Sequence, residues 1–181
     1  MINVASCITA SRIVLTPLVM MFLLQGQWHW ATVVFTIAAL TDLLDGFIAR
    51  RFDQQTRFGQ LLDPVADKCL LMGTMYTLLM VVQLSGWHTV VVYFLLAKEL
   101  IFLSVGGLLI GRYRFFIAPS RLSRAASIAE IVLVLTMLFA LVHGGHVPTT
   151  LVSILLLGNL VLSIWLLVRY VFIIQRQLQD D

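Results

Sequence analysis

The stretch TDLLDGFIARRFDQQTRFGQLLDPVADK, residues 41–68, contains five of the nine acidic residues of this chain. The rest of the chain is strongly hydrophobic: 60% of its 181 residues are apolar and only 12% are charged. Soluble domains average about 45–50% apolar and about 25% charged residues. The composition therefore predicts an integral membrane protein, and the length predicts a single domain over residues 1–181.

Six hydrophobic segments are predicted to cross the bilayer as helices, a task that takes about 17–25 residues per helix. These segments are Ile8–Leu24, Ala31–Ala49, Leu61–Val82, Val90–Ile110, Ile128–Val142 and Leu151–Ile173. The stretch 41–68 covers the end of the second segment, a short polar connection and the start of the third. The predicted fold is therefore an all-α membrane protein, a bundle of six transmembrane helices.

The basic residues of the predicted connections all lie on one side of the membrane. The segments QGQWHW, QLSGWHT and HGGHVPTT contain no Lys or Arg. The N-terminal segment, the other two connections and the C-terminal tail contain Arg12, Arg50, Arg51, Arg57, Arg112, Arg114, Arg121, Arg124, Arg169 and Arg176. Because cytoplasmic loops are enriched in Lys and Arg, both termini are predicted to be cytosolic. Topology and lipid headgroups account for the net charge of +3, so no nucleic-acid partner is expected.

Four aspartates of the opening stretch are spaced so that they share helix faces. Asp42 and Asp45 are three residues apart, and Asp63 and Asp67 are four apart. Residues at these separations lie on one side of a helix. The short polar connection makes the second and third segments antiparallel neighbours. Both pairs are therefore predicted to face one cavity, open to the cytosol, at similar depth.

Such a cluster of carboxylates predicts a metal site. Each ionisable group within a membrane span costs about 2.5–3.5 kcal/mol on insertion scales, so these groups normally have a function. Four adjacent carboxylates also repel one another, and a bound cation would remove that repulsion. Oxygen ligands suit hard divalent ions such as Mg²⁺, Mn²⁺ or Ca²⁺. Asp53, in the connection itself, is instead expected to face solvated headgroups.

Residues between the aspartates favour a phosphorylated ligand beside the metal. Gly46 and Gly59 have no side chain, so a sugar, base or phosphate can approach their backbone closely. Arg50 has a guanidinium group that can bind a phosphate through two hydrogen bonds.

The pattern Asp42-x2-Asp45-Gly46-x2-Ala49-Arg50-x8-Gly59-x3-Asp63-x3-Asp67 resembles, position for position, the signature of the CDP-alcohol phosphatidyltransferase family. That family has six transmembrane helices, with the motif at the cytosolic ends of the second and third. The resemblance implies transfer of a phosphatidyl group from CDP-diacylglycerol to an alcohol, with release of CMP. It also implies a homodimer in a bacterial inner membrane, with the active site facing the cytoplasm.

The resemblance further implies a role for each motif residue. One or two Mg²⁺ or Mn²⁺ ions would be held by Asp42, Asp45, Asp63 and Asp67. Asp67 would also be the general base for the acceptor hydroxyl. The CDP group and its phosphates would be bound by Asn3, Gly46, Ala49, Arg50 and Gly59.

Within the family, the length and the motif segments of the chain resemble those of bacterial phosphatidylglycerophosphate synthases, which use glycerol 3-phosphate as acceptor. The residues expected to bind this acceptor are Lys98, Arg112, Arg114, Arg121 and Arg124. Lys98 and Glu99 are equally well read as a structural ion pair within the membrane. Gly106 and Ala126 stand where those synthases have further cations. This departure leaves open a cardiolipin synthase, which takes phosphatidylglycerol as acceptor.

A divalent-cation transporter is the alternative of another class. A transport path would distribute acidic residues through the bilayer. Here they cluster at one end, and only Glu99 and Glu130 lie elsewhere in the predicted spans. The pattern therefore favours the enzyme.

Overall fold

The structure of the chain is a computed structural model that describes residues 4–52, 57–84, 86–113, 121–144 and 149–179. In residues 42–52 and 57–64, and at 66 and 67, it describes the helical backbone without the side chains. The same holds for residues 4–11, 13, 107–113, 121, 173–174 and 176–179.

All secondary structure in the described ranges is helical, which confirms the predicted all-α class. The six helices are α1 (Val4–Leu24), α2 (Trp28–Phe52), α3 (Arg57–Val82), α4 (Trp87–Tyr113), α5 (Arg121–Val142) and α6 (Thr149–Gln179). Each predicted span lies within one helix, but the helices are longer than the spans. The largest extension at any one end is at α5, which begins seven residues before the predicted start at Ile128. Polar residues end a hydrophobic segment without ending the backbone hydrogen bonds of the helix, so the helix continues beyond the apolar part.

Three helices contain apolar segments long enough to cross a membrane. These segments are Trp87–Gly106, Leu122–Val142 and Thr149–Phe172, with 20, 21 and 24 residues. Among the described residues, the other three helices contain shorter apolar segments, Val14–Leu24, Trp28–Thr41 and Lys68–Val82. Large apolar side chains such as Ile154, Val161 and Phe172 are exposed on the outside of α6. These lengths and surfaces are those of an α-helical membrane protein.

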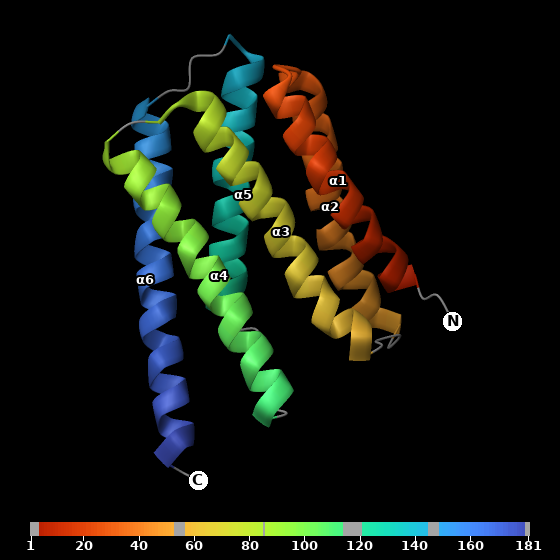
Figure 1. Cartoon of the computed structure of the whole chain (residues 1–181), viewed down its shortest axis with the longest axis vertical. Coiled ribbons are helices and arrows are strands. Elements are labelled where there is room, and N and C mark those ends of the chain that lie inside the picture. The colour runs from red at the N-terminus through yellow and green to blue at the C-terminus, as the bar shows by residue number, and fades with distance from the viewer. Residues whose placement is uncertain (1–3, 53–56, 85, 114–120, 145–148, 180–181) are drawn as a thin grey trace.

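The helices form a closed ring. Around it, α1 packs against α2 and α3, α3 against α4, α4 against α6, α6 against α5, and α5 against α2. A further contact joins α3 to α5 across the ring. Successive helices run in opposite directions, so the start of α1 and the end of α6 lie at the same end of the molecule (Figure 1). This end is called the terminal end below.

The described hydrophobic core lies in the half of the molecule away from the terminal end. Its fully buried members include Leu23 of α1, Phe35 of α2, Leu78 of α3, Leu95 of α4, Leu133 and Met137 of α5, and Leu156 of α6. A second, smaller cluster of Leu122, Ala126 and Leu166 joins α5 to α6 nearer the terminal end. Buried charged side chains lie between the two clusters.

Candidate functional site

The four motif aspartates lie inside helices and not at helix ends, because α2 and α3 continue beyond the predicted spans. Asp42 and Asp45 are ten and seven residues before the last residue of α2. Asp63 and Asp67 are six and ten residues after the first residue of α3. At 1.5 Å per residue, Asp42 and Asp67 each lie about 15 Å along their helix from the α2–α3 connection, and the other two about 9–11 Å. The two pairs therefore lie at matching heights on helices that run in opposite directions. The predicted direct packing of these two helices is not found among the described residues, because α2 and α3 each pack against α1 and share no extended contact with each other.

The other predicted site residues are described to different extents. Helical backbone alone is described for Gly46, Ala49, Arg50, Gly59, Arg112 and Arg121. Asn3 and Arg114 lie outside the described residues. Lys98 and Arg124 are described with their side chains: Lys98 is buried within α4, and Arg124 is exposed in the first turn of α5.

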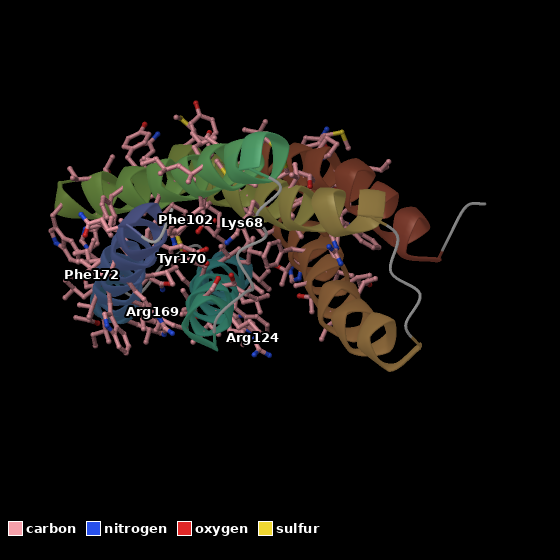
Figure 2. All side chains as sticks on the ribbon, turned by 90° about the horizontal axis from the view of Figure 1, so that it is seen from below. Lys68, Phe102, Arg124, Arg169, Tyr170 and Phe172 are labelled. Atoms are coloured by element: carbon pink, nitrogen blue, oxygen red, sulfur yellow. The ribbon has the colours of Figure 1, made fainter. Side chains whose placement is uncertain are left out.

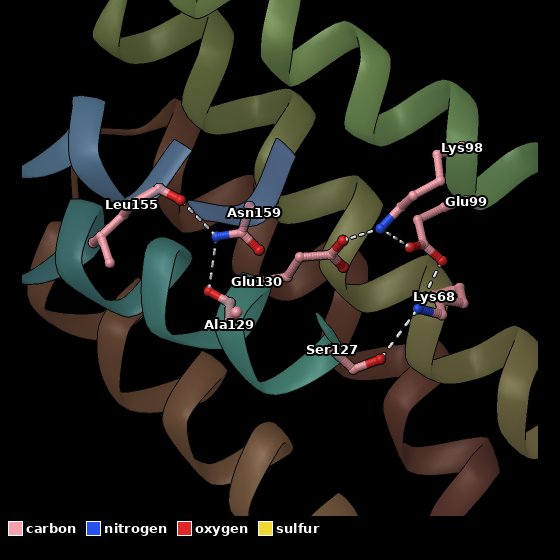
Figure 3. A network of polar contacts seen from close by, with 8 residues as sticks. All are labelled: Lys68, Lys98, Glu99, Ser127, Ala129, Glu130, Leu155 and Asn159. Atoms are coloured by element: carbon pink, nitrogen blue, oxygen red, sulfur yellow. Dashed lines mark hydrogen bonds and ion pairs between the residues drawn. The ribbon is translucent and has the colours of Figure 1, made fainter. Parts of the chain in front are cut away.

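Lys98 belongs to a chain of charged side chains that links α3, α4 and α5 (Figure 3). Its Nζ lies 2.8 Å from Oε1 of Glu99 and donates a hydrogen bond to Oε1 of Glu130. The side chains of Lys98 and Glu130 are only 1% and 3% exposed. An ammonium group has three donors, and here two of them face carboxylates inside the protein. Lys98 is therefore a buried ion-pair residue.

Lys68 forms the more accessible end of the same chain. Its Nζ lies 2.6 Å from Oε2 of Glu99 and donates a weaker hydrogen bond, of 3.4 Å, to Oγ of Ser127 on α5. The Lys68 side chain is 21% exposed. The two oxygens of Glu99 thus bind two different lysines. In the order Glu130, Lys98, Glu99 and Lys68, the charged side chains extend from the buried interior to the partly exposed side chain of Lys68.

A neutral side chain extends this buried polar region to α6. Nδ2 of Asn159 donates hydrogen bonds to the backbone oxygen of Ala129, at 3.2 Å, and to that of Leu155, at 2.9 Å (Figure 3). Ala129 directly precedes Glu130 on α5. Asn159 therefore fixes α6 against the turn of α5 that bears Glu130.

The four charged residues have no net charge, since two lysines face two glutamates. A buried ion pair gains little over apolar packing, but removal of one partner costs about 3–5 kcal/mol because the other charge stays buried. The network of Lys68, Lys98, Glu99 and Glu130 therefore contributes more to the relative positions of α3, α4 and α5 than to the free energy of unfolding. Both glutamates that lie away from the aspartate motif are paired with lysine, and such pairing does not suit a path for divalent cations.

The sequence interpretation missed Lys68 and Ser127 and gave Glu130 no partner. Lys68 directly follows Asp67 and is the first residue of an apolar segment, which was the available signal. Its partner is 31 positions away on another helix, and Glu130 is 32 positions from Lys98. The spacing within one helix does not indicate such pairs.

The motif is chemically suited to a divalent cation. Its four carboxylates supply only oxygen ligands, which hard ions such as Mg²⁺ and Mn²⁺ prefer. The two pairs lie at matching heights on α2 and α3, which both pack against α1. That they share one metal site stays a prediction. Among the side chains that the structure describes, no group of three or more His, Cys, Asp or Glu residues forms a metal site. The side chains of the four aspartates are outside that set.

Comparison with known proteins links this arrangement to one family. A family model described as CDP-alcohol phosphatidyltransferase matches residues 2–173. A protein of Aquifex aeolicus (strain VF5) is 36% identical over 119 residues, which are 65% of this chain and 65% of that protein. It is named CDP-diacylglycerol--glycerol-3-phosphate 3-phosphatidyltransferase.

Two enterobacterial proteins with the same name match a shorter part of the chain. The protein of Salmonella choleraesuis (strain SC-B67) is 42% identical over 102 residues, and that of Escherichia coli (strain K12) is 41% identical over 102 residues. Each match covers 55% of this chain and 56% of the relative. The chain thus matches between about half and two thirds of the length of these curated relatives.

Proposed function

Since the chain belongs to the CDP-alcohol phosphatidyltransferase family, we propose that it transfers a phosphatidyl group from CDP-diacylglycerol to glycerol 3-phosphate. The products are phosphatidylglycerophosphate and CMP. The observation that carries this proposal is the family match over residues 2–173, which includes all four motif aspartates. The names of the relatives from Aquifex, Salmonella and Escherichia support the choice of acceptor.

The proposed setting is a bacterial inner membrane crossed six times, with both termini in the cytoplasm. The distribution of arginines in the sequence supports this orientation. The even number of helices and the common position of the two termini agree with it (Figure 1). The aspartate pairs then lie on the cytoplasmic side of α2 and α3, where the water-soluble acceptor arrives. The proposed assembly is a homodimer.

In the proposed site, Asp42, Asp45, Asp63 and Asp67 hold one or two Mg²⁺ or Mn²⁺ ions. A bound divalent ion would neutralise pyrophosphate charge and orient the donor for phosphoryl transfer. Gly46, Ala49 and Gly59 leave space for the cytidine nucleotide because they have little or no side chain. Asn3 and Arg50 bind the nucleotide and its phosphates.

Asp67 is the proposed general base. It accepts the proton of the acceptor hydroxyl as the hydroxyl oxygen forms a bond to the phosphorus of the phosphatidyl group. The bond from that phosphorus to the bridging oxygen of the pyrophosphate breaks, and CMP leaves with the bond electrons. A base must lie within hydrogen-bond reach of the proton that it removes. Asp67 lies about 15 Å along α3 from the first residue of that helix.

Phosphatidylglycerol is the second candidate acceptor, which would make the chain a cardiolipin synthase. Ala126 packs in the small apolar cluster with Leu122 and Leu166. Gly106 has no other heavy atom within 4 Å of where a Cβ would lie. Neither position provides a cation, so the site has fewer positive charges for a small dianion than that of bacterial phosphatidylglycerophosphate synthases.

The test is the release of CMP from CDP-diacylglycerol by the purified full-length protein in detergent with Mg²⁺ or Mn²⁺. Glycerol 3-phosphate and phosphatidylglycerol are supplied in parallel, and the lipid product is identified by mass spectrometry. We expect phosphatidylglycerophosphate to form with glycerol 3-phosphate. Formation of cardiolipin alone would replace the proposed acceptor by the second candidate.

Removal of the divalent ion with EDTA should abolish the reaction, and added Mn²⁺ should restore it. The variant Asp67→Asn should lose at least about 100-fold in kcat, within the range that general-base catalysis supplies. Asp53→Asn, in the α2–α3 connection, is the matched control and should keep full activity. Full turnover by Asp67→Asn would rule out this base.

A further inference from the structure

The structure provides one accessible lysine next to the proposed general base, and that lysine is Lys68. It directly follows Asp67 on α3, so the two residues lie at the same depth. Figure 2, which views the terminal end, shows Lys68 where α3 and α4 approach α5. Lys98, the lysine expected from the sequence to bind the acceptor, is the more enclosed of the two.

Lys68 and Lys98 differ in how many N–H donors of the ammonium group are available to hydrogen-bond a substrate. Lys98 is 1% exposed and points two donors at Glu99 and Glu130. Lys68 is 21% exposed, and among the described side chains it has one close carboxylate partner and donates one long hydrogen bond, to Ser127. An ammonium group has three donors, so Lys68 has donor capacity on its accessible side. A phosphate that reached Lys98 would be a third buried anion, next to the carboxylates of Glu99 and Glu130.

A second cation lies one helical turn away on α5. Arg124 precedes Ser127 by three residues, so the two share a helix face, with about 5–6 Å between their Cβ atoms. Arg124 is exposed, and Figure 2 shows it on α5 at the terminal end. The hydroxyl of Ser127 accepts a hydrogen bond of 3.4 Å from the ammonium group of Lys68, and Arg124 lies one turn before Ser127 on the same helix. Two cations and a hydroxyl suit the phosphate of a small acceptor.

We propose that Lys68 binds the phosphate group of the acceptor and, together with Arg124, selects an anionic acceptor. Glu99 is its positioning residue, since one carboxylate oxygen fixes the Lys68 ammonium group and the other is held by Lys98. Lys98 and Glu130 hold Glu99 in place and do not contact the acceptor. This assignment rests on the proposed function and names the residue that recognises the acceptor in it.

The test compares Lys68→Met, Lys68→Arg and Lys68→Met/Glu99→Gln with the wild-type protein under the same CMP-release assay. We expect Lys68→Met to raise the KM for glycerol 3-phosphate about 10- to 100-fold, as loss of a charged hydrogen bond does. The KM for CDP-diacylglycerol should change little, and Lys68→Arg should keep part of the affinity. Arg169→Met removes an exposed arginine of α6 that is also seen from the terminal end (Figure 2) and should behave as wild type.

The double variant separates recognition from charge balance. If Lys68 only neutralised Glu99, Lys68→Met/Glu99→Gln would recover the wild-type KM for glycerol 3-phosphate. If Lys68 binds the phosphate, the double variant stays as weak as Lys68→Met. Recovery in the double variant, or an equal rise in both KM values, would overturn the assignment. The thermal midpoint of each variant without substrate shows whether it is folded.

Direct binding distinguishes failure of this assignment from failure of the proposed function. Glycerol 3-phosphate should raise the thermal midpoint of the wild-type protein in detergent, and glycerol at the same concentration should not. The rise should disappear in Lys68→Met. If the wild type shows this shift without turnover, the proposed reaction fails and the binding role stands. If the wild type turns over and Lys68→Met has the wild-type KM, only the role of Lys68 fails. If neither a shift nor turnover occurs, both fail.

Discussion

At the scale of single residues, the arrangement of four charges explains why Lys98 and Glu130 lie so deep in the bundle. Each is nearly inaccessible, and the only described carboxylates near Lys98 are Glu130 and its neighbour Glu99. Desolvation makes such pairs costly to form and still more costly to break. Replacement of Lys98 or Glu130 alone is therefore expected to lower the free energy of unfolding strongly. Replacement of both together is expected to lower it much less.

We predict that Lys98→Met and Glu130→Gln each destabilise the protein by about 3–5 kcal/mol, since each leaves an uncompensated buried charge. The combination Lys98→Met/Glu130→Gln should lose much less than the sum of the two single losses, because the only charged pair that remains is Lys68 and Glu99. Chemical unfolding in mixed micelles measures the three values. Additive losses would show that the two side chains do not interact.

At the scale of helices, the contact of α1 with α3 depends on a residue without a side chain. A Cβ placed on Gly73 would lie 3.1 Å from Cγ2 of Thr16 and 3.1 Å from Sδ of Met20. The methionine can move, but the hydroxyl of Thr16 is hydrogen-bonded to the backbone oxygen of Arg12 at 2.8 Å. Small residues allow helices to approach closely in membranes. Gly73 therefore sets how closely α3 approaches α1, six residues from Asp67.

Replacement of Gly73 by Leu should separate α1 from α3 and destabilise the protein by about 1–3 kcal/mol, the usual cost of overpacking. It should also reduce CMP release, since α3 bears Asp63 and Asp67. Gly158→Leu on α6 is the matched control, because no neighbouring atom lies within 4 Å of its added Cβ. Equal thermal midpoints for the two variants would contradict the close contact at Gly73.

In the molecule as a whole, the described hydrophobic core lies away from the terminal end of the helix ring. The charged side chains of Lys68, Lys98, Glu99 and Glu130 lie nearer to the terminal end. The connections at the two ends also differ in composition. Those between α1 and α2, α3 and α4, and α5 and α6 contain no Lys or Arg. From the positive-inside rule, we expect the terminal end to face the cytoplasm.

Cysteine labelling in intact cells tests this orientation. In a protein with Cys7 and Cys69 replaced by serine, His143→Cys adds a thiol at an exposed position after α5, and Gln175→Cys adds one at an exposed position near the end of α6. A maleimide that cannot cross the membrane should label position 143 directly and position 175 only after permeabilisation. Labelling of both without permeabilisation would contradict the proposed topology.

Features that depend on residues close together along the chain could be predicted from the amino-acid sequence. Hydrophobic length predicted six helices, because a helix satisfies its own backbone hydrogen bonds. The spacing of Asp42, Asp45, Asp63 and Asp67 indicated two faces on two helices, because helical periodicity is local. The same four residues, with the glycines between them, carried the resemblance to the family. Their role in binding metal stays a prediction.

The identity of neighbouring helices, and of the charged side chains that pair between them, came from the packing of the helices. From the sequence, Lys98 could be either an acceptor-binding residue or a member of an ion pair. The sequence did not indicate that Glu130 pairs with Lys98. Packing of α4 against α3 brings Glu99 to Lys68, and the Lys68 side chain stays partly exposed. The physical reason is distance: these partners are about 30 positions apart, so their contacts depend on how whole helices pack, which no local pattern specifies.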